Sequence, residues 1–181
     1  MSKLAIALAM SAMALGLAVS AAPAPARAQS EAATVRQLYD KELILDMMAR
    51  YCFALDDADG ATYAAMFTQD GVLISGNGAN VQKGRAAIKA YVDGRKPAPG
   101  APSAARINRH AFHNAVVDIN GDRATVRAYW TTTSSAGGGA PALASMGRYQ
   151  DTLVKRNGKW LWTERRITTD MTAAPAAAPA R

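Results

Sequence analysis

The longest regular pattern of apolar positions predicts an amphipathic helix over residues 34–55. Neither glycine nor proline interrupts this run, and its apolar side chains recur at helical spacing: Val35, Leu38, Ile44, Met48, Cys52 and Leu55. An acidic cluster of Asp56, Asp57 and Asp59 ends the helix, and Gly60 follows it. Because aspartate is a favoured N-cap, Asp59 is expected to start a second, short helix over residues 61–67.

Shorter patterns continue the chain with alternating strand and helix signals. Residues 72–74 and 81–83 are predicted to form two short strands, separated by the turn-rich Ser75-Gly76-Asn77-Gly78. A third helix is expected over residues 85–93. Residues 94–105 contain three prolines and two glycines, so this segment is predicted to be a loop.

The C-terminal half is extended in character. Four segments are rich in Val, Tyr, Trp and Thr and predict strands: 108–119, 124–133, 145–155 and 160–169. Asn120-Gly121 and Asn157-Gly158 predict hairpin turns, because Asn-Gly readily adopts the positive φ that such turns need. Helices followed by an antiparallel meander indicate an α+β domain in which helices cover one face of a curved sheet.

Both ends of the chain differ from this domain. Lys3, an uncharged apolar run over residues 4–19 and the small-residue motif Ala26-Arg27-Ala28 predict a signal peptide over residues 1–28. Cleavage after Ala28 would start the mature protein at Gln29 and place it in the periplasm or outside the cell. The Ala/Pro tail over residues 173–181 is predicted to be disordered, which leaves one domain over residues 29–172.

Composition narrows the classes of function. The 181 residues are 50% hydrophobic and 19% charged, the balance of a chain with an apolar core. The net charge of +7 is spread along the chain, so nucleic-acid binding is not favoured. One cysteine excludes an intramolecular disulfide, and Cys52 is predicted to be a core residue. Two histidines leave little for a metal site. No cofactor is expected.

A series of short strings spans residues 35–170: Arg50-Tyr51, Ala54-Leu55-Asp56, Met66-Phe67-Thr68-Gln69-Asp70-Gly71, Lys83-Gly84-Arg85, Arg109-His110 with Asn114, and Gly147-Arg148-Tyr149. In this order they resemble the SnoaL-like branch of the NTF2-like superfamily. The resemblance implies a cone-shaped α+β barrel, in which a strongly curved, mostly antiparallel sheet surrounds a pocket that three helices close. The superfamily includes scytalone dehydratase, a dehydrochlorinase and polyketide cyclases, and also members without catalysis.

The resemblance also implies a site. By motif, Asp56 takes the place of an aspartate that pairs with a general-base histidine, which corresponds to His110, and Arg165 resembles an arginine that assists the leaving group. These residues suit a cofactor-independent lyase or dehydratase, because imidazole accepts a proton near neutral pH and a guanidinium stabilises a developing anion. The expected substrate is small and hydrophobic, and aromatic hydroxylated compounds fit it. A non-catalytic protein that binds hydrophobic ligands is the alternative.

Residue spacing adds the expected substrate contacts. In a regular strand His110 and His113 point to opposite faces, so only one can enter a pocket without a bulge. We expect His110 to be that residue and His113 to lie on the surface or in an interface. The residues expected to bind substrate are aromatic or polar: Tyr51, Tyr63, Phe112, Asn114, Tyr129 and Tyr149. Related enzymes associate through the sheet, so a homodimer or homotrimer is expected, with no membrane contact after signal cleavage.

Overall fold

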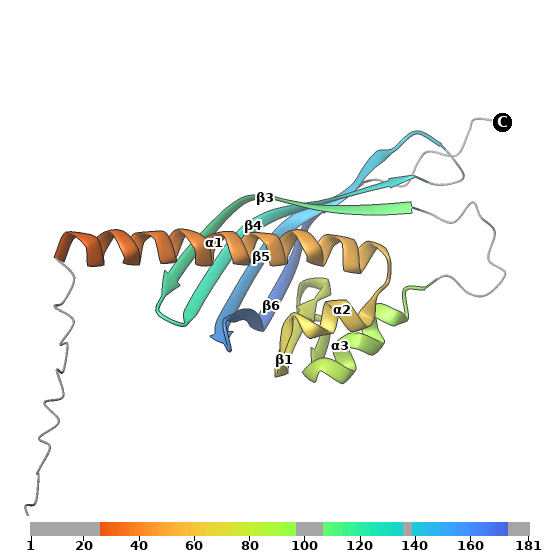
Figure 1. Ribbon diagram of the computed structural model, residues 1–181. Helices are drawn as coiled ribbons and strands as arrows, with labels where there is room; N and C mark the ends of the chain where they lie inside the picture. Colours follow the sequence, from red (N-terminus) through yellow and green to blue (C-terminus); the bar gives the residue numbers. More distant parts are fainter. Residues whose placement is uncertain (1–25, 97–106, 136–138, 174–181) are drawn as a thin grey trace, which may run out of the picture.

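The computed structural model describes residues 26–96, 107–135 and 139–173 (Figure 1). Within these residues the helices are α1 (Ala26–Asp56), α2 (Gly60–Ala65) and α3 (Gly84–Asp93), with a 3-10 turn η1 (Gly76–Gly78). The strands are β1 (Phe67–Ser75), β2 (Asn80–Lys83), β3 (Ile107–Asn120), β4 (Arg123–Ser135), β5 (Ala142–Arg156) and β6 (Lys159–Thr172).

The strands form one sheet in the order β2-β1-β6-β5-β4-β3. All neighbouring pairs are antiparallel except β1 and β6, which run parallel. Figure 1 shows the long strands bending and twisting, with α1 lying across the sheet and α2 and α3 near β1. The prediction of an α+β fold with a curved, mostly antiparallel sheet and three helices is confirmed.

Local sequence explains most of the element boundaries. Asp59 caps α2 as predicted, since its side chain accepts a hydrogen bond of 3.0 Å from the Thr62 amide. Phe67 was expected in this helix but starts β1 instead, because its fully buried ring packs against Trp162 of β6. The Asn-Gly turns form as predicted, with positive φ at Gly121, Asn157 and Gly158.

The first helix is longer than its apolar pattern. It covers the predicted residues 34–55 and begins already at Ala26, so the predicted cleavage motif forms its first turn. The remainder of the predicted signal segment, the loop from residue 97 and the tail from residue 174 lie outside the described residues. Export and cleavage therefore stay predictions. No helix in the described part of the chain is long and apolar enough to span a membrane.

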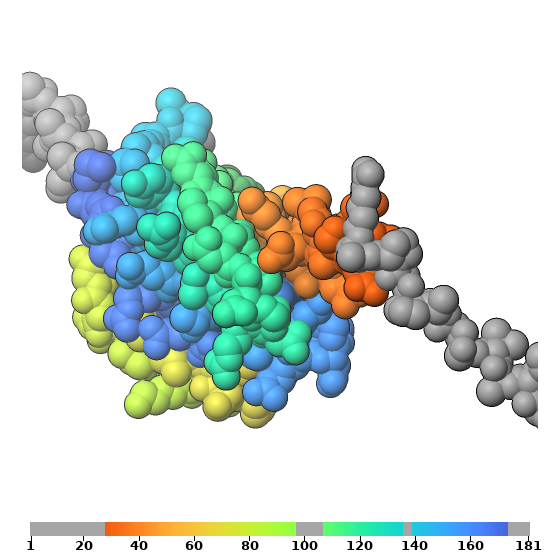
Figure 2. All heavy atoms as spheres, turned by 90° about the vertical axis from the view of Figure 1, so that its left-hand side faces the viewer, coloured from red at the N-terminus to blue at the C-terminus, as the bar shows by residue number. Residues whose placement is uncertain are grey.

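The N-terminal half of α1 extends beyond the body of the domain (Figure 2). Its apolar side chains Val35, Leu38 and Tyr39 are largely exposed. Val116 and Tyr129 on the outer face of the sheet are about half exposed. These positions fit the expectation of self-association, which stays a prediction.

A buried ion pair joins α1 to the far end of the sheet. Asp40 is buried on α1, and its Oδ1 accepts hydrogen bonds from Lys155 Nζ at 2.6 Å and from Trp160 Nε1 at 3.1 Å. Burial alone would raise the pKa of this carboxyl, but the two hydrogen bonds and the Lys155 charge lower it below 3.8. Asp40 therefore stays ionised near neutral pH and fixes the position of α1 over β5 and β6.

Candidate active site

A cavity of about 480 Å³ lies between the helices and the sheet. Residues of all three helices and of β1, β3, β4, β5 and β6 form its wall. The principal lining side chains are Tyr51, Leu55, Tyr63, Ser75, Tyr91, Arg95, Asn108, His110, Trp130, Thr132, Ser145, Tyr149, Ile167 and Thr169. Both apolar rings and hydroxyl groups line it. A cavity of this size and mixture is typical of a small-molecule site.

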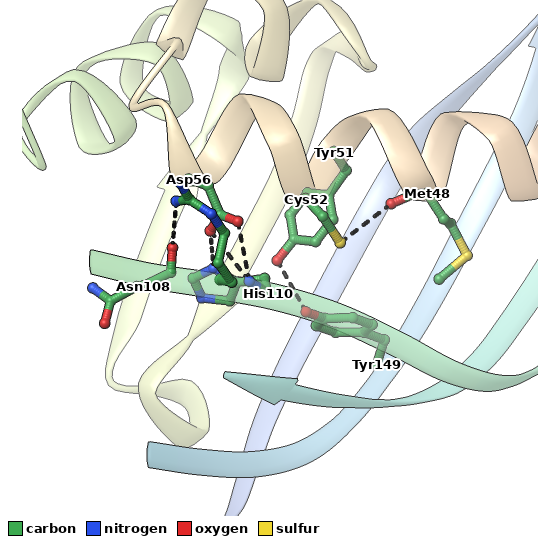
Figure 3. A network of polar contacts seen from close by, with 8 residues as sticks. Met48, Tyr51, Cys52, Asp56, Asn108, His110 and Tyr149 are labelled. Atoms are coloured by element: carbon green, nitrogen blue, oxygen red, sulfur yellow. Dashed lines mark hydrogen bonds and ion pairs between the residues drawn. The ribbon is translucent and has the colours of Figure 1, made fainter. Parts of the chain in front are cut away.

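Asp56 and His110 meet at the edge of this cavity (Figure 3). Asp56 is the last residue of α1, and His110 lies on β3. The His110 Nδ1 lies 2.6 Å from Asp56 Oδ1, and the His110 backbone amide donates to Asp56 Oδ2 at 3.1 Å. Only 6% of the Asp56 side chain and 15% of the His110 side chain are exposed. The carboxylate therefore fixes both the backbone and the ring of His110.

This contact determines which ring nitrogen is available for chemistry. A carboxylate can only accept hydrogen bonds, so Nδ1 carries the hydrogen and Nε2 is the basic nitrogen of neutral His110. No described residue forms a hydrogen bond with Nε2. Since His110 lines the cavity, this geometry would allow Nε2 to accept a proton from a bound molecule, with the carboxylate behind the ring.

A β-bulge in β3 decides which histidine faces the cavity. Ile119, Val117 and Ala115 are partly buried and alternate with exposed residues, so they mark the inward side of β3. If this alternation continued toward the start of a regular strand, the next inward residue would be His113. Asn114 instead adopts a φ of +51°, and the register with β4 shifts between His113 and Val116. The inward side therefore changes to Phe112 and His110.

His113 consequently lies on the exposed side of the sheet. Its Nε2 lies 2.8 Å from the Thr131 hydroxyl. Asn114 was expected on the His110 face, but the bulge leaves its side chain exposed and away from the cavity. The spacing argument assumed a regular strand, which this single extra residue breaks.

Two tyrosines bring a hydrogen-bond donor to the cavity. The hydroxyls of Tyr51 on α1 and Tyr149 on β5 lie 3.0 Å apart (Figure 3). Both residues line the cavity, as Tyr63 does. Burial raises the pKa of Tyr51 and of Tyr149 well above the ordinary value, so both stay protonated. One of the two hydroxyl hydrogens is used in their mutual bond, which leaves the other for a ligand oxygen.

The remaining expected substrate contacts are not brought to this cavity. Phe112 is partly buried and packs against the core without lining the cavity. Tyr129 is 50% exposed on the outer face of the sheet, because its neighbours Ala128 and Trp130 are the inward residues of β4.

Arg165 lies beneath the cavity instead of in its wall. It is fully buried, and its guanidinium faces the rings of Tyr51, Tyr149 and Trp162. Asp151, directly opposite on β5, approaches it with an Nη1–Oδ2 distance of 3.4 Å. The expected direct contact between Arg165 and a leaving group is therefore not supported, because Tyr51 and Tyr149 separate it from the cavity.

Tyr91 and Arg95 also line the cavity and were not predicted from the sequence. Tyr91 on α3 lies with its hydroxyl 3.2 Å from Ser75 Oγ and accepts a bond of 2.8 Å from Arg95. Burial raises the pKa of Tyr91, but the Ser75 hydrogen bond and the Arg95 charge outweigh it and lower the pKa below the ordinary value. The helical spacing of Tyr91 and Arg95, four residues apart, was the available signal.

Two further observations concern metals and thiols. Within residues 26–96, 107–135 and 139–173, no group of three or more His, Cys, Asp or Glu side chains is placed to hold a metal ion. Cys52 is buried, as predicted, and burial raises the pKa of its thiol to about 11 despite the opposing charge of Arg165. The thiol is therefore protonated near neutral pH.

Comparison with known proteins identifies the family. The model of the SnoaL-like domain matches residues 36–166, and the chain belongs to this family. The family lies in the NTF2-like superfamily, which includes dehydratases and cyclases. No curated protein matches the chain.

Solved structures share the fold. Rv3472 of Mycobacterium tuberculosis, of unknown function, is 28% identical over 76% of this chain and 75% of its own, with a TM-score of 0.65. An NTF2-like protein with a cystatin-like fold from Novosphingobium aromaticivorans is 25% identical over 81% and 92%, with a TM-score of 0.68. ActVI-ORFA of Streptomyces coelicolor is 25% identical over 74% and 98%, with a TM-score of 0.63.

Proposed function

We propose that the protein is a cofactor-independent lyase, of the dehydratase type, that acts on a small hydrophobic substrate. The observation that carries this proposal is the 2.6 Å contact between Asp56 and His110 at the wall of the cavity. The aromatic rings of Tyr63 and Trp130, which also line the cavity, favour a substrate with an aromatic ring.

The proposed reaction is an elimination. Nε2 of His110 removes a proton from a carbon of the substrate, and the electron pair of that C–H bond forms a new double bond while the C–O bond on the neighbouring carbon breaks. The departing hydroxyl keeps the electron pair of the C–O bond and takes the proton from the imidazolium, so that water leaves and His110 is neutral again. Asp56 stabilises the imidazolium that forms and keeps the ring oriented. The free hydroxyl hydrogen of the Tyr51 and Tyr149 pair is available to a substrate oxygen that gains negative charge.

The alternative is a protein that binds a hydrophobic ligand without converting it. One observation favours it: Arg165, the third residue of the expected catalytic set, does not reach the cavity. The same cavity would then hold a ligand between its aromatic rings.

A screen with matched histidine variants separates the two functions. Purified protein is incubated with hydroxylated aromatic compounds, and substrate loss is followed by absorbance. For a compound that is converted, we expect His110→Gln to lose at least about a hundredfold in turnover, the usual contribution of a general base. His113→Gln, on the exposed face of the same strand, should keep wild-type turnover. Compounds that bind without any conversion would support the alternative, and a fully active His110→Gln would exclude His110 as the base.

A further inference from the structure

We propose that Arg165 is a positioning residue that acts through Tyr51 and Tyr149, strengthening their hydroxyls as donors to a substrate oxygen that gains negative charge. This inference rests on the proposed function and deepens it, because it selects a class of reaction. The favoured reactions pass through an enolate-like or phenolate-like oxygen anion.

Arg165 is enclosed by aromatic faces. The central guanidinium carbon lies 3.9 Å from the ring centroid of Tyr51, 3.9 Å from that of Tyr149 and 4.2 Å from that of Trp162. The side chain has no exposed surface. Tyr51 and Tyr149 line the cavity and their hydroxyls contact each other, so these two rings connect the cation directly to the cavity.

Arg165 is paired with a carboxylate but forms no hydrogen bonds within the described part of the chain. None of its three guanidinium nitrogens has a hydrogen-bond partner among the described residues. Asp151 is the carboxylate paired with it, but the 3.4 Å approach of Nη1 to Oδ2 does not form a hydrogen bond. A guanidinium normally forms short, paired hydrogen bonds with a carboxylate, so this pair leaves the cation oriented toward the rings.

A cation on the face of a phenol ring stabilises negative charge on that phenol. Burial raises the pKa of Tyr51 and Tyr149, and the charge of Arg165 opposes this rise in both. The effect is strong because the guanidinium carbon lies only 3.9 Å from each ring centroid in a fully buried environment of low dielectric constant. A hydroxyl made more acidic in this way is a stronger hydrogen-bond donor to an anionic oxygen.

A purely structural role does not require a charge at this position. Buried ion pairs are often no more stabilising than apolar side chains of the same volume, because both charges lose their hydration. An apolar residue such as methionine could fill the space between the rings. The charge is therefore better explained by its action on the two tyrosines.

A phenol probe tests this action without a known substrate. 4-Nitrophenol absorbs at different wavelengths as phenol and phenolate, so its spectrum reports its ionisation when bound. At neutral pH, wild-type protein should bind the probe with a larger phenolate fraction than in water. Arg165→Met should lower the ionisation constant of the bound probe about tenfold, which is one pKa unit.

Further variants separate the possible explanations. Asp151→Asn removes the compensating anion and should change the ionisation in the opposite direction, toward more phenolate. Arg166→Met, which changes the exposed neighbour paired with Glu164, should leave it unchanged. Tyr51→Phe and Tyr149→Phe should reduce it, because they remove the donors. Circular dichroism checks that each variant is folded, and Asp151→Asn decides the question alone if Arg165→Met does not fold.

Each outcome has a distinct meaning. If only the tyrosine variants reduce ionisation, the role of Arg165 is overturned while the tyrosine donors of the proposed function stand. A reduction in both Arg165→Met and Asp151→Asn would indicate a structural role and also overturn it. If wild-type protein does not bind the phenolate in preference to the phenol, both the Arg165 role and the tyrosine donors are overturned.

Discussion

Asp56 holds His110 at two points, since its carboxylate accepts from the backbone amide at 3.1 Å and contacts the ring nitrogen Nδ1 at 2.6 Å. Asp56→Asn keeps the size of the side chain but removes the charge that supports an imidazolium. We expect turnover to fall about a hundredfold or more. Steady-state kinetics on a converted compound would measure this, with the exposed neighbour Asp57→Asn as the control. Equal losses in both variants would remove the dyad from the mechanism.

The bulge at Asn114 predicts a link between backbone conformation and activity. Asn114→Gly should preserve stability, because glycine tolerates the φ of +51°. Asn114→Val should cost about 1–2 kcal/mol, because a β-branched residue is strained in this region. Urea unfolding measures the difference, and turnover should fall only in the valine variant, in which the strand is driven to turn His110 away. A stable, active valine variant would contradict the role of the bulge.

Asp40 predicts a dependence of stability on acid. Its folded pKa lies below 3.8, so its contribution is fully present above pH 3.8 and is lost as the pH falls through the lowered folded pKa. Asp40→Asn should lower the free energy of unfolding near neutral pH by roughly 1–3 kcal/mol. Urea titrations across this range should then show a smaller loss of stability on acidification in the variant. Parallel curves would show that another group causes the acid sensitivity.

Cys52 predicts slow labelling by thiol reagents. The folded thiol is buried and its pKa is about 11, so little thiolate forms at neutral pH. Native protein should react with a disulfide reagent at least tenfold more slowly than urea-unfolded protein, by the ratio of thiolate fractions. Rapid labelling of the native protein would mean that α1 opens readily from the sheet.

The chain ends predict a minimal folded unit. Ala173 donates a backbone hydrogen bond to Ala144 and lines the cavity, so the unit includes one residue more than the expected domain of residues 29–172. Protein trimmed to residues 29–173 should melt within about 2 °C of protein that starts at Gln29 and keeps the full tail. Mass spectrometry of exported protein should find Gln29 as its first residue. A larger change in melting temperature would show that the tail packs on the domain.

The order of the elements and the pairing of Asp56 with His110 could be predicted from the sequence. The Asn-Gly turns at residues 120–121 and 157–158 determined which strands pair, and the family motifs brought Asp56 and His110 together. Local patterns did not reveal the bulge, because a single positive φ at Asn114 reverses the inward side without any change in strand composition. The position of Arg165 could not be predicted from the sequence either, because it depends on how three aromatic rings from α1, β5 and β6 pack around its side chain.

The parallel pairing of β1 with β6 also has a consequence for the order of folding. Leu73 lies opposite Arg165, so this strand pair joins segments that are about ninety residues apart in the chain. Such non-local pairing is slow, because a long loop must close before its contacts form. During synthesis β1, α3 and the hairpin of β3 and β4 are complete before β6 leaves the ribosome. The aromatic enclosure of Arg165 and the cavity above it can therefore form only after β6 has become available, so they are the last part of the domain to assemble.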